Sequence, residues 1–410
     1  MRRRGPVDPD AAATLPTDPT PERTPMPENA PRQTATQAPT QTPTQAEPPR
    51  REPLEPRPDL PPATLVVDGR RLVVTRAWPD PDRARLAVEL DDGGARRAGF
   101  LRVDGPELLP AGRDPRLGAL ARLADVGEVV SHRPGRRAVV RLGDRFVKVV
   151  RRGRAEDVLH GIERAAAFDE PFRTPAVLDH DESTVTFAAL PGIGLHDPAP
   201  FSPERWRRAW EAVCSAWVTA SSAPADPGAP VHDAAAEGAV LAGWVDRVAA
   251  WIDDVERTRT VAEQLARRLR RLPGRPLVPA HRDLHDKQLL VPADDGDPSA
   301  PGLLDVDTAC RADPALDLGN LRAHATLRRR QGIWDAAQSR AVAAAVTDAA
   351  ARRDVPTEVL RTYELAALLR LGCVYAVRPR HTAVAAALRA EVAAILGGET
   401  PAPSAADRAG

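Results

Sequence analysis

Lysine is rare in this chain, and the positions of its lysines are informative. Of the 57 basic side chains, two are lysine, Lys148 and Lys287, and the others are arginine. Lys148 lies in an apolar, strand-like run, Phe146–Val150, whereas Lys287 lies in residues 281–288, His-Arg-Asp-Leu-His-Asp-Lys-Gln. Lysine carries a compact point charge that the planar arginine fork does not reproduce at a crowded phosphate. A strand lysine followed along the chain by a His-x-Asp loop is typical of sites that transfer phosphoryl groups.

Three oxygen-bearing side chains of this region are expected to face one point. The short run Leu289–Val291, a polar turn and the run Leu303–Asp305 predict a β-hairpin. This hairpin places Asp283 and Gln288 at the same end as Asp305. Mg²⁺ takes a few oxygen ligands from a protein and leaves its other positions to water and phosphate. The spacing therefore predicts a magnesium site at this end of the hairpin.

The overall composition argues against several classes of protein. Acidic and basic residues balance at 57 each, and their interspersed pattern argues against a nucleic-acid partner or a membrane surface. No uninterrupted apolar run approaches the length of a bilayer span, and Pro and Asp follow the basic start where a signal peptide needs an apolar core. Three widely separated cysteines, Cys214, Cys310 and Cys373, indicate reduced thiols. We therefore expect a soluble, cytoplasmic protein.

Composition also divides the chain into two tails and two ordered lobes. Residues 1–62 hold 17 of the 43 prolines and almost nothing large and apolar, so we expect a disordered tail. Its Thr-Pro pairs are candidate sites for phosphorylation or for a protein partner, although a solvated tail is the simpler interpretation. Residues 63–190 are predicted to form a β-rich lobe with extra N-terminal hairpins. Residues 191–397 are predicted to form a helical lobe, and residues 398–410 a second tail.

Periodicity predicts the elements of both lobes. Apolar runs separated by Gly-containing turns predict three hairpins and one further strand, at 65–74, 86–103, 138–150 and 183–187. Helices are predicted in this lobe at 116–124 and 155–168. In the second lobe a helix begins at Ser202-Pro203-Glu204, and its tryptophans, at three- and four-residue spacing, are predicted core. Further helical segments are predicted near 236–271, 315–330, 334–352, 356–376 and 381–396.

Residues 281–318 contain several short motifs whose order along the chain is more specific than any one of them. The set comprises His-x-Asp-Leu-His, an amide side chain after the loop, Leu-Asp after one hairpin, and Asp-Pro-x-x-Asp-Leu, all within residues 281–318. This set resembles the aminoglycoside phosphotransferase and choline kinase family, whose members are relatives of the protein kinases, and a thinner likeness extends from about Val129 to His324. The resemblance implies an α+β, two-lobed protein-kinase-like fold. It also implies transfer of the γ-phosphate of ATP, with Mg²⁺, to a hydroxyl group of a small molecule.

The resemblance implies roles for the residues of the helical lobe, which would carry catalysis and the acceptor. Asp283 is expected to be the catalytic base that orients or deprotonates the acceptor hydroxyl. Asp305 and Gln288 are expected to bind Mg²⁺. His281 is expected to support the loop structurally, and Asp317 to hold it by hydrogen bonds.

The resemblance also implies roles in the β-rich lobe, which would bind the nucleotide. Lys148 is expected to bind the α- and β-phosphates and to be positioned by a carboxylate of the following helix. Glu163 is the better candidate for this carboxylate, since Glu156 lies near the helix start and is expected to cap it. The backbone of Ala188 and Ala189 is expected to bind the adenine.

Three departures from the family pattern leave alternatives open. Gln288 stands where the family has Asn. Its amide oxygen can still bind a metal, but the extra methylene shifts that oxygen, and octahedral Mg²⁺ tolerates little misplacement, so a second metal site stays open. Residues 132–137 occupy the phosphate-loop position with a single glycine. Lys287 has two open interpretations, a phosphate contact and a salt bridge with a neighbouring carboxylate.

A competing function, a nucleotide-binding pseudokinase or regulatory protein, fits Gln288, the glycine-poor loop, the proline-rich tail and the additional hairpins before residue 105. A protein kinase is a third option, which the absence of an Ala-Pro-Glu segment after Asp307 disfavours. The identity of the acceptor stays open. An aminoglycoside would need an acidic pocket, but residues 200–272 carry balanced charges.

Overall fold

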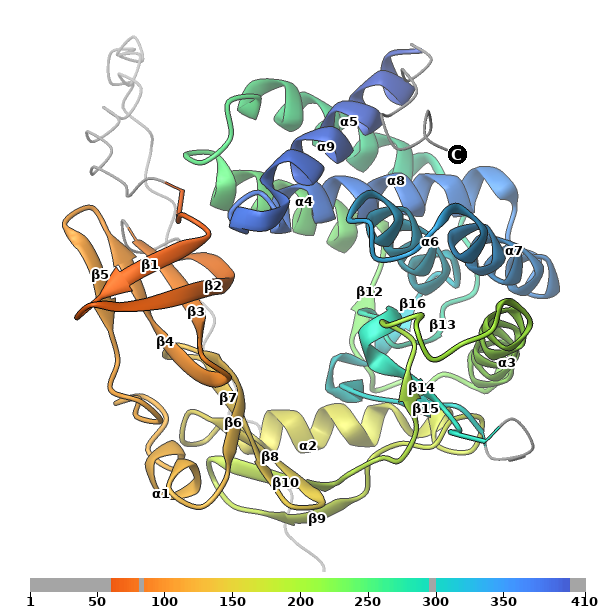
Figure 1. Cartoon of the computed structure of the whole chain (residues 1–410). Coiled ribbons are helices and arrows are strands. Elements are labelled where there is room, and N and C mark those ends of the chain that lie inside the picture. Colours follow the sequence, from red (N-terminus) through yellow and green to blue (C-terminus); the bar gives the residue numbers. More distant parts are fainter. Residues whose placement is uncertain (1–59, 81–84, 295–299, 399–410) are drawn as a thin grey trace, which may run out of the picture. The chain divides into compact units, whose positions relative to one another are not determined.

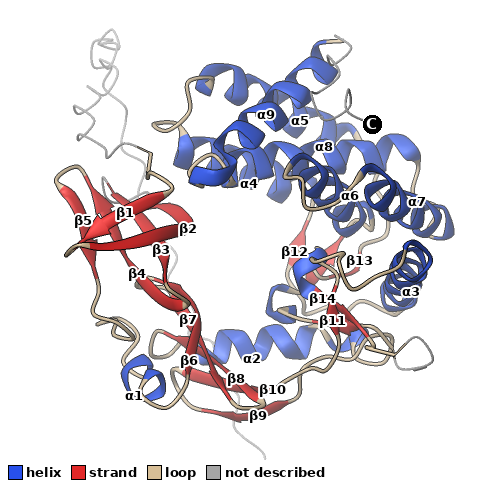
Figure 2. Ribbon diagram, in the orientation of Figure 1, coloured by secondary structure: helices blue, strands red, loops and turns tan. Residues whose placement is uncertain are grey.

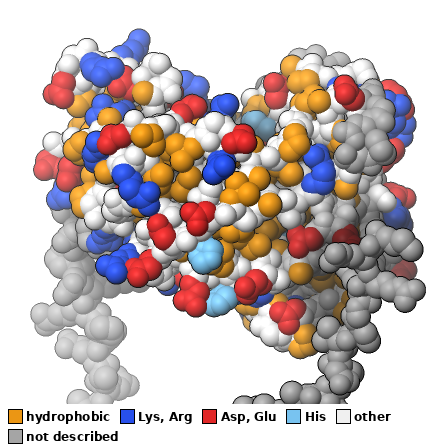
Figure 3. Space-filling view, turned by 90° about the horizontal axis from the view of Figure 1, so that it is seen from below, with side chains coloured by type: hydrophobic (Ala, Val, Ile, Leu, Met, Phe, Trp, Pro, Cys, Tyr) orange, Lys and Arg blue, Asp and Glu red, His pale blue; other side chains and the backbone are white. Residues whose placement is uncertain are grey.

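The computed structural model describes residues 60–80, 85–294 and 300–398. Both predicted tails, including the candidate partner-binding segment, therefore lie almost entirely outside the described residues. None of the helices within these ranges is long and apolar enough to cross a membrane. On the face shown in Figure 3, acidic and basic side chains are interspersed, in keeping with the balanced charge.

The N-terminal strands form a five-stranded antiparallel sheet in the order β1-β2-β3-β4-β5 (Figure 1). Its strands are β1 (Thr64–Val67), β2 (Arg70–Asp80), β3 (Arg85–Asp92), β4 (Ala95–Arg102) and β5 (Gly105–Leu108). The first two predicted hairpins are confirmed, whereas β5, Gly-Pro-Glu-Leu, lacks the apolar alternation that would predict it. Side chains such as Leu72, Val74 and Val88 share one buried cluster with Trp251 and Val377 of the helical part. The sheet is thereby attached to the helices.

A second antiparallel sheet carries Lys148. Its order is β6-β7-β8-β10-β9, formed by β6 (Glu128–Arg133), β7 (Arg137–Leu142), β8 (Arg145–Val150), β9 (Val177–His180) and β10 (Thr184–Ala188). The third predicted hairpin and the predicted strand at 183–187 are confirmed. Lys148 lies on the central strand β8, opposite Val139 and Val185. Backbone pairing with strands on both sides therefore fixes the position of the Lys148 backbone in the sheet.

Two helices accompany this sheet. The first, α1 (Leu120–Ala124), is shorter than the predicted 116–124. The second, α2 (Ala155–Arg164), is followed by a short 3₁₀ turn at Ala166–Phe168, so the predicted helix at 155–168 is correct apart from this tightened last turn.

Buried carboxylates join the two sheets. Glu89 on β3, 2% exposed, accepts the backbone N–H of His132 on β6 at 2.7 Å. Asp114 accepts the N–H of Gly135 at 2.7 Å and contacts the His132 ring at 2.9 Å. The turn at 133–137, which occupies the predicted phosphate-loop position, is therefore held by the N-terminal part of the chain.

Helices make up most of the second half (Figure 2). They are α3 (Pro203–Ser222), α4 (Ala234–Val248), α5 (Val255–Arg271), α6 (Ala315–Arg330), α7 (Ala336–Arg352), α8 (Thr357–Val374) and α9 (Thr382–Gly397). The Ser202 hydroxyl caps α3 by accepting the N–H of Arg205 at 3.2 Å, as the sequence predicts. The predicted α+β architecture, β-rich and then helical, is confirmed.

The helical core also agrees with the sequence, apart from one break. The three tryptophans of α3, Trp206, Trp210 and Trp217, are buried in it. The predicted helical segment at 236–271 is two packed helices, α4 and α5. The chain leaves the first helix after Ala249, and Trp251 enters the apolar cluster of the first sheet.

Two small sheets position the loop of residues 281–288. One has the order β12-β16-β13, with β12 (Val231–His232), β13 (Val278–Ala280) and β16 (Cys310–Ala312). The other has the order β11-β14-β15, with β11 (Ile193–Gly194), β14 (Leu289–Val291) and β15 (Gly302–Leu303). The loop begins where β13 ends and finishes where β14 begins. The predicted hairpin of β14 and β15 is confirmed.

Candidate functional site

A fully buried carboxylate at the start of α6 holds the loop of residues 281–288. Asp317 accepts the backbone N–H groups of His281 and Arg282, each at 2.8 Å, and the Trp217 indole N–H at 3.1 Å. Arg282 has a φ of 72°, a left-handed conformation that is costly for a residue with a side chain. Asp317 therefore fixes a strained turn directly before Asp283.

We expect Asp317→Ala to destabilise the fold by about 3 kcal/mol, because the buried N–H groups of His281 and Trp217 and the part-buried N–H of Arg282 lose their acceptor. Chemical denaturation measures this change. The matched control is Asp233→Ala, which removes an exposed helix-capping carboxylate from the Ala236 N–H and should cost about 1 kcal/mol. Equal losses in the two variants would contradict the role assigned to Asp317.

His281 connects this turn to the second half of the site. Its Nδ1 accepts the Asp283 N–H at 3.3 Å, so Nε2 carries the proton and donates to the Leu304 carbonyl oxygen at 2.9 Å. The ring is fully buried, and the Thr308 hydroxyl donates to the His281 carbonyl oxygen. The structural role predicted for this histidine is confirmed.

The predicted metal ligands lie at the same end of the β14–β15 hairpin. The Leu304 N–H donates to the Gln288 carbonyl oxygen at 2.8 Å, so the residue before Asp305 is bonded to Gln288. Asp305 itself has a φ of 58°, a left-handed conformation that aspartate tolerates better than most residues. Its carboxylate oxygens and the Gln288 amide are of the type that Mg²⁺ prefers, so the donor set fits the predicted ion.

Lys148 reaches this end of the hairpin from the second sheet. Its Nζ lies 2.9 Å from Asp305 Oδ1 and 2.8 Å from Asp307 Oδ2. Burial opposes the charge of Asp305, but the cations Lys148 and Arg137 outweigh it and lower the pKa of this carboxyl below its usual value. The lysine and the aspartate that the sequence assigns to one site are therefore in direct contact.

Glu163 does not form the predicted pair with Lys148. Its side chain is exposed, and within the described ranges Asp305 and Asp307 are the carboxylates at ion-pair distance from the lysine. A Cβ on Gly161 would lie 2.2 Å from the Asp307 carbonyl oxygen, so α2 packs against the site through this glycine. Glu163 follows by two residues, about 200° around the helix, and points away. Asp307 occupies the place predicted for the glutamate.

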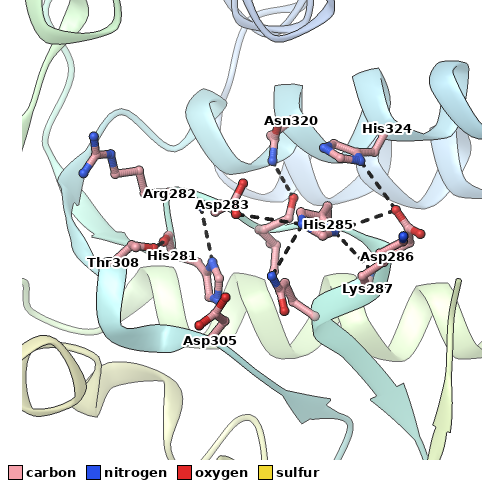
Figure 4. A network of polar contacts seen from close by, with 12 residues as sticks. His281, Arg282, Asp283, His285, Asp286, Lys287, Asp305, Thr308, Asn320 and His324 are labelled. Atoms are coloured by element: carbon pink, nitrogen blue, oxygen red, sulfur yellow. Dashed lines mark hydrogen bonds and ion pairs between the residues drawn. The ribbon is translucent and has the colours of Figure 1, made fainter. Parts of the chain in front are cut away.

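Asp283 is about half exposed, with a side-chain accessibility of 47%. Figure 4 shows His285 between Asp283 and Asp286. The Lys287 N–H donates to His285 Nδ1, so the proton of the neutral ring lies on Nε2, 3.8 Å from the Asp283 carboxylate. Burial, and then the nearby His324, lower the pKa of His285 well below its ordinary value, which keeps the ring neutral. His285 thus presents an N–H toward the predicted catalytic base.

A buried ionic network beneath the loop is a feature that the sequence did not indicate. Asp286 is fully buried and accepts Arg328 Nε at 2.9 Å and His196 Nδ1 at 2.5 Å. His285, Asp286 and His324 are close enough for a metal site, but the guanidinium of Arg328 already neutralises the carboxylate and would repel a cation. We interpret the network as the support of the loop.

The two backbone N–H groups of the predicted adenine-binding segment already donate hydrogen bonds to other parts of the chain. The N–H of Ala188 donates to the Ala176 carbonyl oxygen at 2.9 Å, and the N–H of Ala189 donates to the Asp144 carbonyl oxygen at 2.8 Å. A base bound here would therefore have to use other backbone groups than these two donors.

The chain belongs to the phosphotransferase enzyme family, whose family model matches residues 129–355. The resemblance seen in the sequence is thereby confirmed. No curated protein sequence matches the chain.

Solved structures show remote likenesses. An aminoglycoside phosphotransferase from Streptomyces rimosus is 23% identical, with a TM-score of 0.46, over 63% of this chain and 98% of its own. A glucosamine kinase is 20% identical, with a TM-score of 0.46, over 80% of this chain and 94% of its own. A choline/ethanolamine kinase family protein from Mesorhizobium loti is 17% identical, with a TM-score of 0.45, over 71% of this chain and 95% of its own.

Proposed function

We propose that this protein transfers the γ-phosphate of ATP to a hydroxyl group of a small molecule, with Mg²⁺ as cofactor. The main support is one continuous set of contacts. It runs from Asp283 through His281 and Leu304 to Asp305, and from there to Lys148. Phosphoryl transfer needs positioning and charge neutralisation more than covalent help from the protein, and this set offers both.

Each residue of this set has a distinct task in the proposed reaction. Asp283 would orient the acceptor hydroxyl and accept its proton. Lys148 would exchange its bond to Asp305 for the nucleotide phosphates while Asp307 holds its ammonium group. Asp305 and Gln288 would hold Mg²⁺, which when bound neutralises charge on the phosphate oxygens. We also propose a cytoplasmic location, where ATP is supplied.

Transfer of label from γ-labelled ATP to a small-molecule extract of the source cells tests this proposal. We expect a labelled product with the wild-type chain and none with Lys148→Met, which keeps the length of the side chain but removes the phosphate-binding charge. An absence of transfer by wild-type protein that binds Mg·ATP would contradict the proposal.

A nucleotide-binding pseudokinase is the second candidate. It is favoured by Gln288, which stands in place of the family's Asn and whose amide nitrogen lies 3.5 Å from the Nε2 atom of His285.

Gln288→Asn distinguishes the two candidates. In an enzyme, the shorter amide changes the metal geometry, so we expect transfer to rise or persist and its Mg²⁺ dependence to shift. A steady-state titration of Mg²⁺ measures this change. A chain in which neither form transfers phosphate, while both bind nucleotide equally, would be a binding protein.

A further inference from the structure

The turn between β6 and β7 has no free backbone donor at its centre. Glycine-rich loops cover nucleotide phosphates in protein kinases, and their backbone N–H groups are the available donors. In this turn Pro134 has no N–H. The N–H of Gly135 donates to the Asp114 carboxylate at 2.7 Å. The N–H of Arg136 donates to the Arg133 carbonyl oxygen at 3.1 Å. A phosphate beside these three residues would therefore have to be bound by a side chain.

Arg137, the first residue of β7, shares one face of the second sheet with Lys148. The register pairs Lys148 with Val139, two residues after Arg137. Every second residue of a strand lies on the same face, and diagonal neighbours on paired strands are about 7–8 Å apart, within reach of long side chains. The residue between, Ala138, is fully buried in the apolar cluster on the opposite face. The Arg137 and Lys148 side chains therefore start from neighbouring positions on one face.

Two other arginines of this hairpin have partners elsewhere. Arg141 also lies on the face of Arg137, but at the opposite end of β7, where its guanidinium is 3.9 Å from Glu128. Arg133, opposite Arg137 on β6, lies over the Trp78 ring of the first sheet, 5.2 Å from its centre. Arg137 is exposed, and no carboxylate of the described ranges lies at ion-pair distance from it. Its guanidinium is thus available to a ligand at the end of the strand where the turn lies.

We propose that Arg137 binds the nucleotide phosphates from the side of this turn, together with Lys148. The inference rests on the proposed function for the presence of a nucleotide. Lys148 brings one positive charge against the two carboxylates of Asp305 and Asp307, so a triphosphate gains from a further cation here. The planar fork of arginine matches phosphate oxygens in pairs. Arg137 thereby replaces the backbone donors that the turn does not supply.

Calorimetric titration of the full-length protein with Mg·ATP, and separately with adenosine, tests this assignment. We expect Arg137→Met to weaken the binding of Mg·ATP about tenfold, because one charged contact is lost. Adenosine has no phosphate, so its binding should stay unchanged. The matched controls are Arg136→Met in the turn and Arg141→Met at the other end of the strand, which should bind both ligands as the wild type does. All three side chains are exposed, and thermal unfolding checks that each variant is folded.

Unchanged binding of Mg·ATP by Arg137→Met overturns the proposal. An equal loss in either control variant also overturns it, because the effect would then be one of net charge. An equal loss for adenosine overturns it as well, since the residue would then act on the nucleoside. The transfer assay is read separately, because binding requires no catalysis. Transfer without a specific effect of Arg137→Met refutes only this assignment, whereas a specific effect without transfer refutes only the enzyme.

Discussion

Replacing Asp283 by asparagine is expected to slow phosphoryl transfer by about 100- to 10,000-fold, the usual contribution of a positioned base. Asparagine keeps the shape of the side chain but cannot take a proton from the acceptor hydroxyl. The affinity for Mg·ATP should change little, since the carboxylates that contact Lys148 are Asp305 and Asp307. Steady-state rates and calorimetric titration of Mg·ATP measure the two quantities separately.

The matched control is Asp179→Asn, which changes an exposed aspartate on β9 in the same isosteric way. It should leave both the rate and the affinity unchanged. Undiminished transfer by Asp283→Asn would remove this residue from the mechanism. A parallel loss of nucleotide affinity would instead assign it to nucleotide binding.

Replacing Asp305 by asparagine should weaken Mg·ATP binding itself, by about 10- to 100-fold, because a charged ligand is replaced by a neutral one. The fold should tolerate the change, since Lys148 keeps Asp307 at 2.8 Å and is not left unpaired. Titration with ATP in the presence and absence of Mg²⁺ is the measurement. The wild type should bind more tightly with Mg²⁺, and the variant should lose most of this difference.

A suitable control is Asp181→Asn in the turn before β10, where the exposed carboxylate accepts the N–H groups of Ser183 and Thr184 and the Arg122 guanidinium. Its Mg²⁺ dependence should match that of the wild type. An Asp305→Asn variant whose affinity still rises with Mg²⁺ as in the wild type would show that the metal is held elsewhere.

The central part of the site was predictable because its residues are close in sequence. Asp283, Gln288 and Asp305 lie on one loop and one hairpin, and hairpin geometry alone brings them to the same end. His281 and Asp317 follow from the same local pattern, since each bonds backbone groups within this segment.

The remaining features depend on tertiary packing that spacing does not encode. Whether Glu163 reaches Lys148 depends on the rotation of α2, which is set by the close approach of Gly161 to Asp307. Asp286 of the loop meets Arg328 of α6 and His196, which lie far from it in the sequence. An arginine-rich chain offers too many candidates for such a partner to be chosen from sequence.

The position of the first sheet affects where the protein can be shortened. The family match begins at residue 129, yet Trp251 and Val377 are covered by side chains from residues 65–101. The His132 N–H, inside the matched region, depends on Glu89. A fragment cut at the family boundary would expose an apolar face and leave a backbone donor without its acceptor. The smallest independently folding unit of the second half should therefore begin before Thr64.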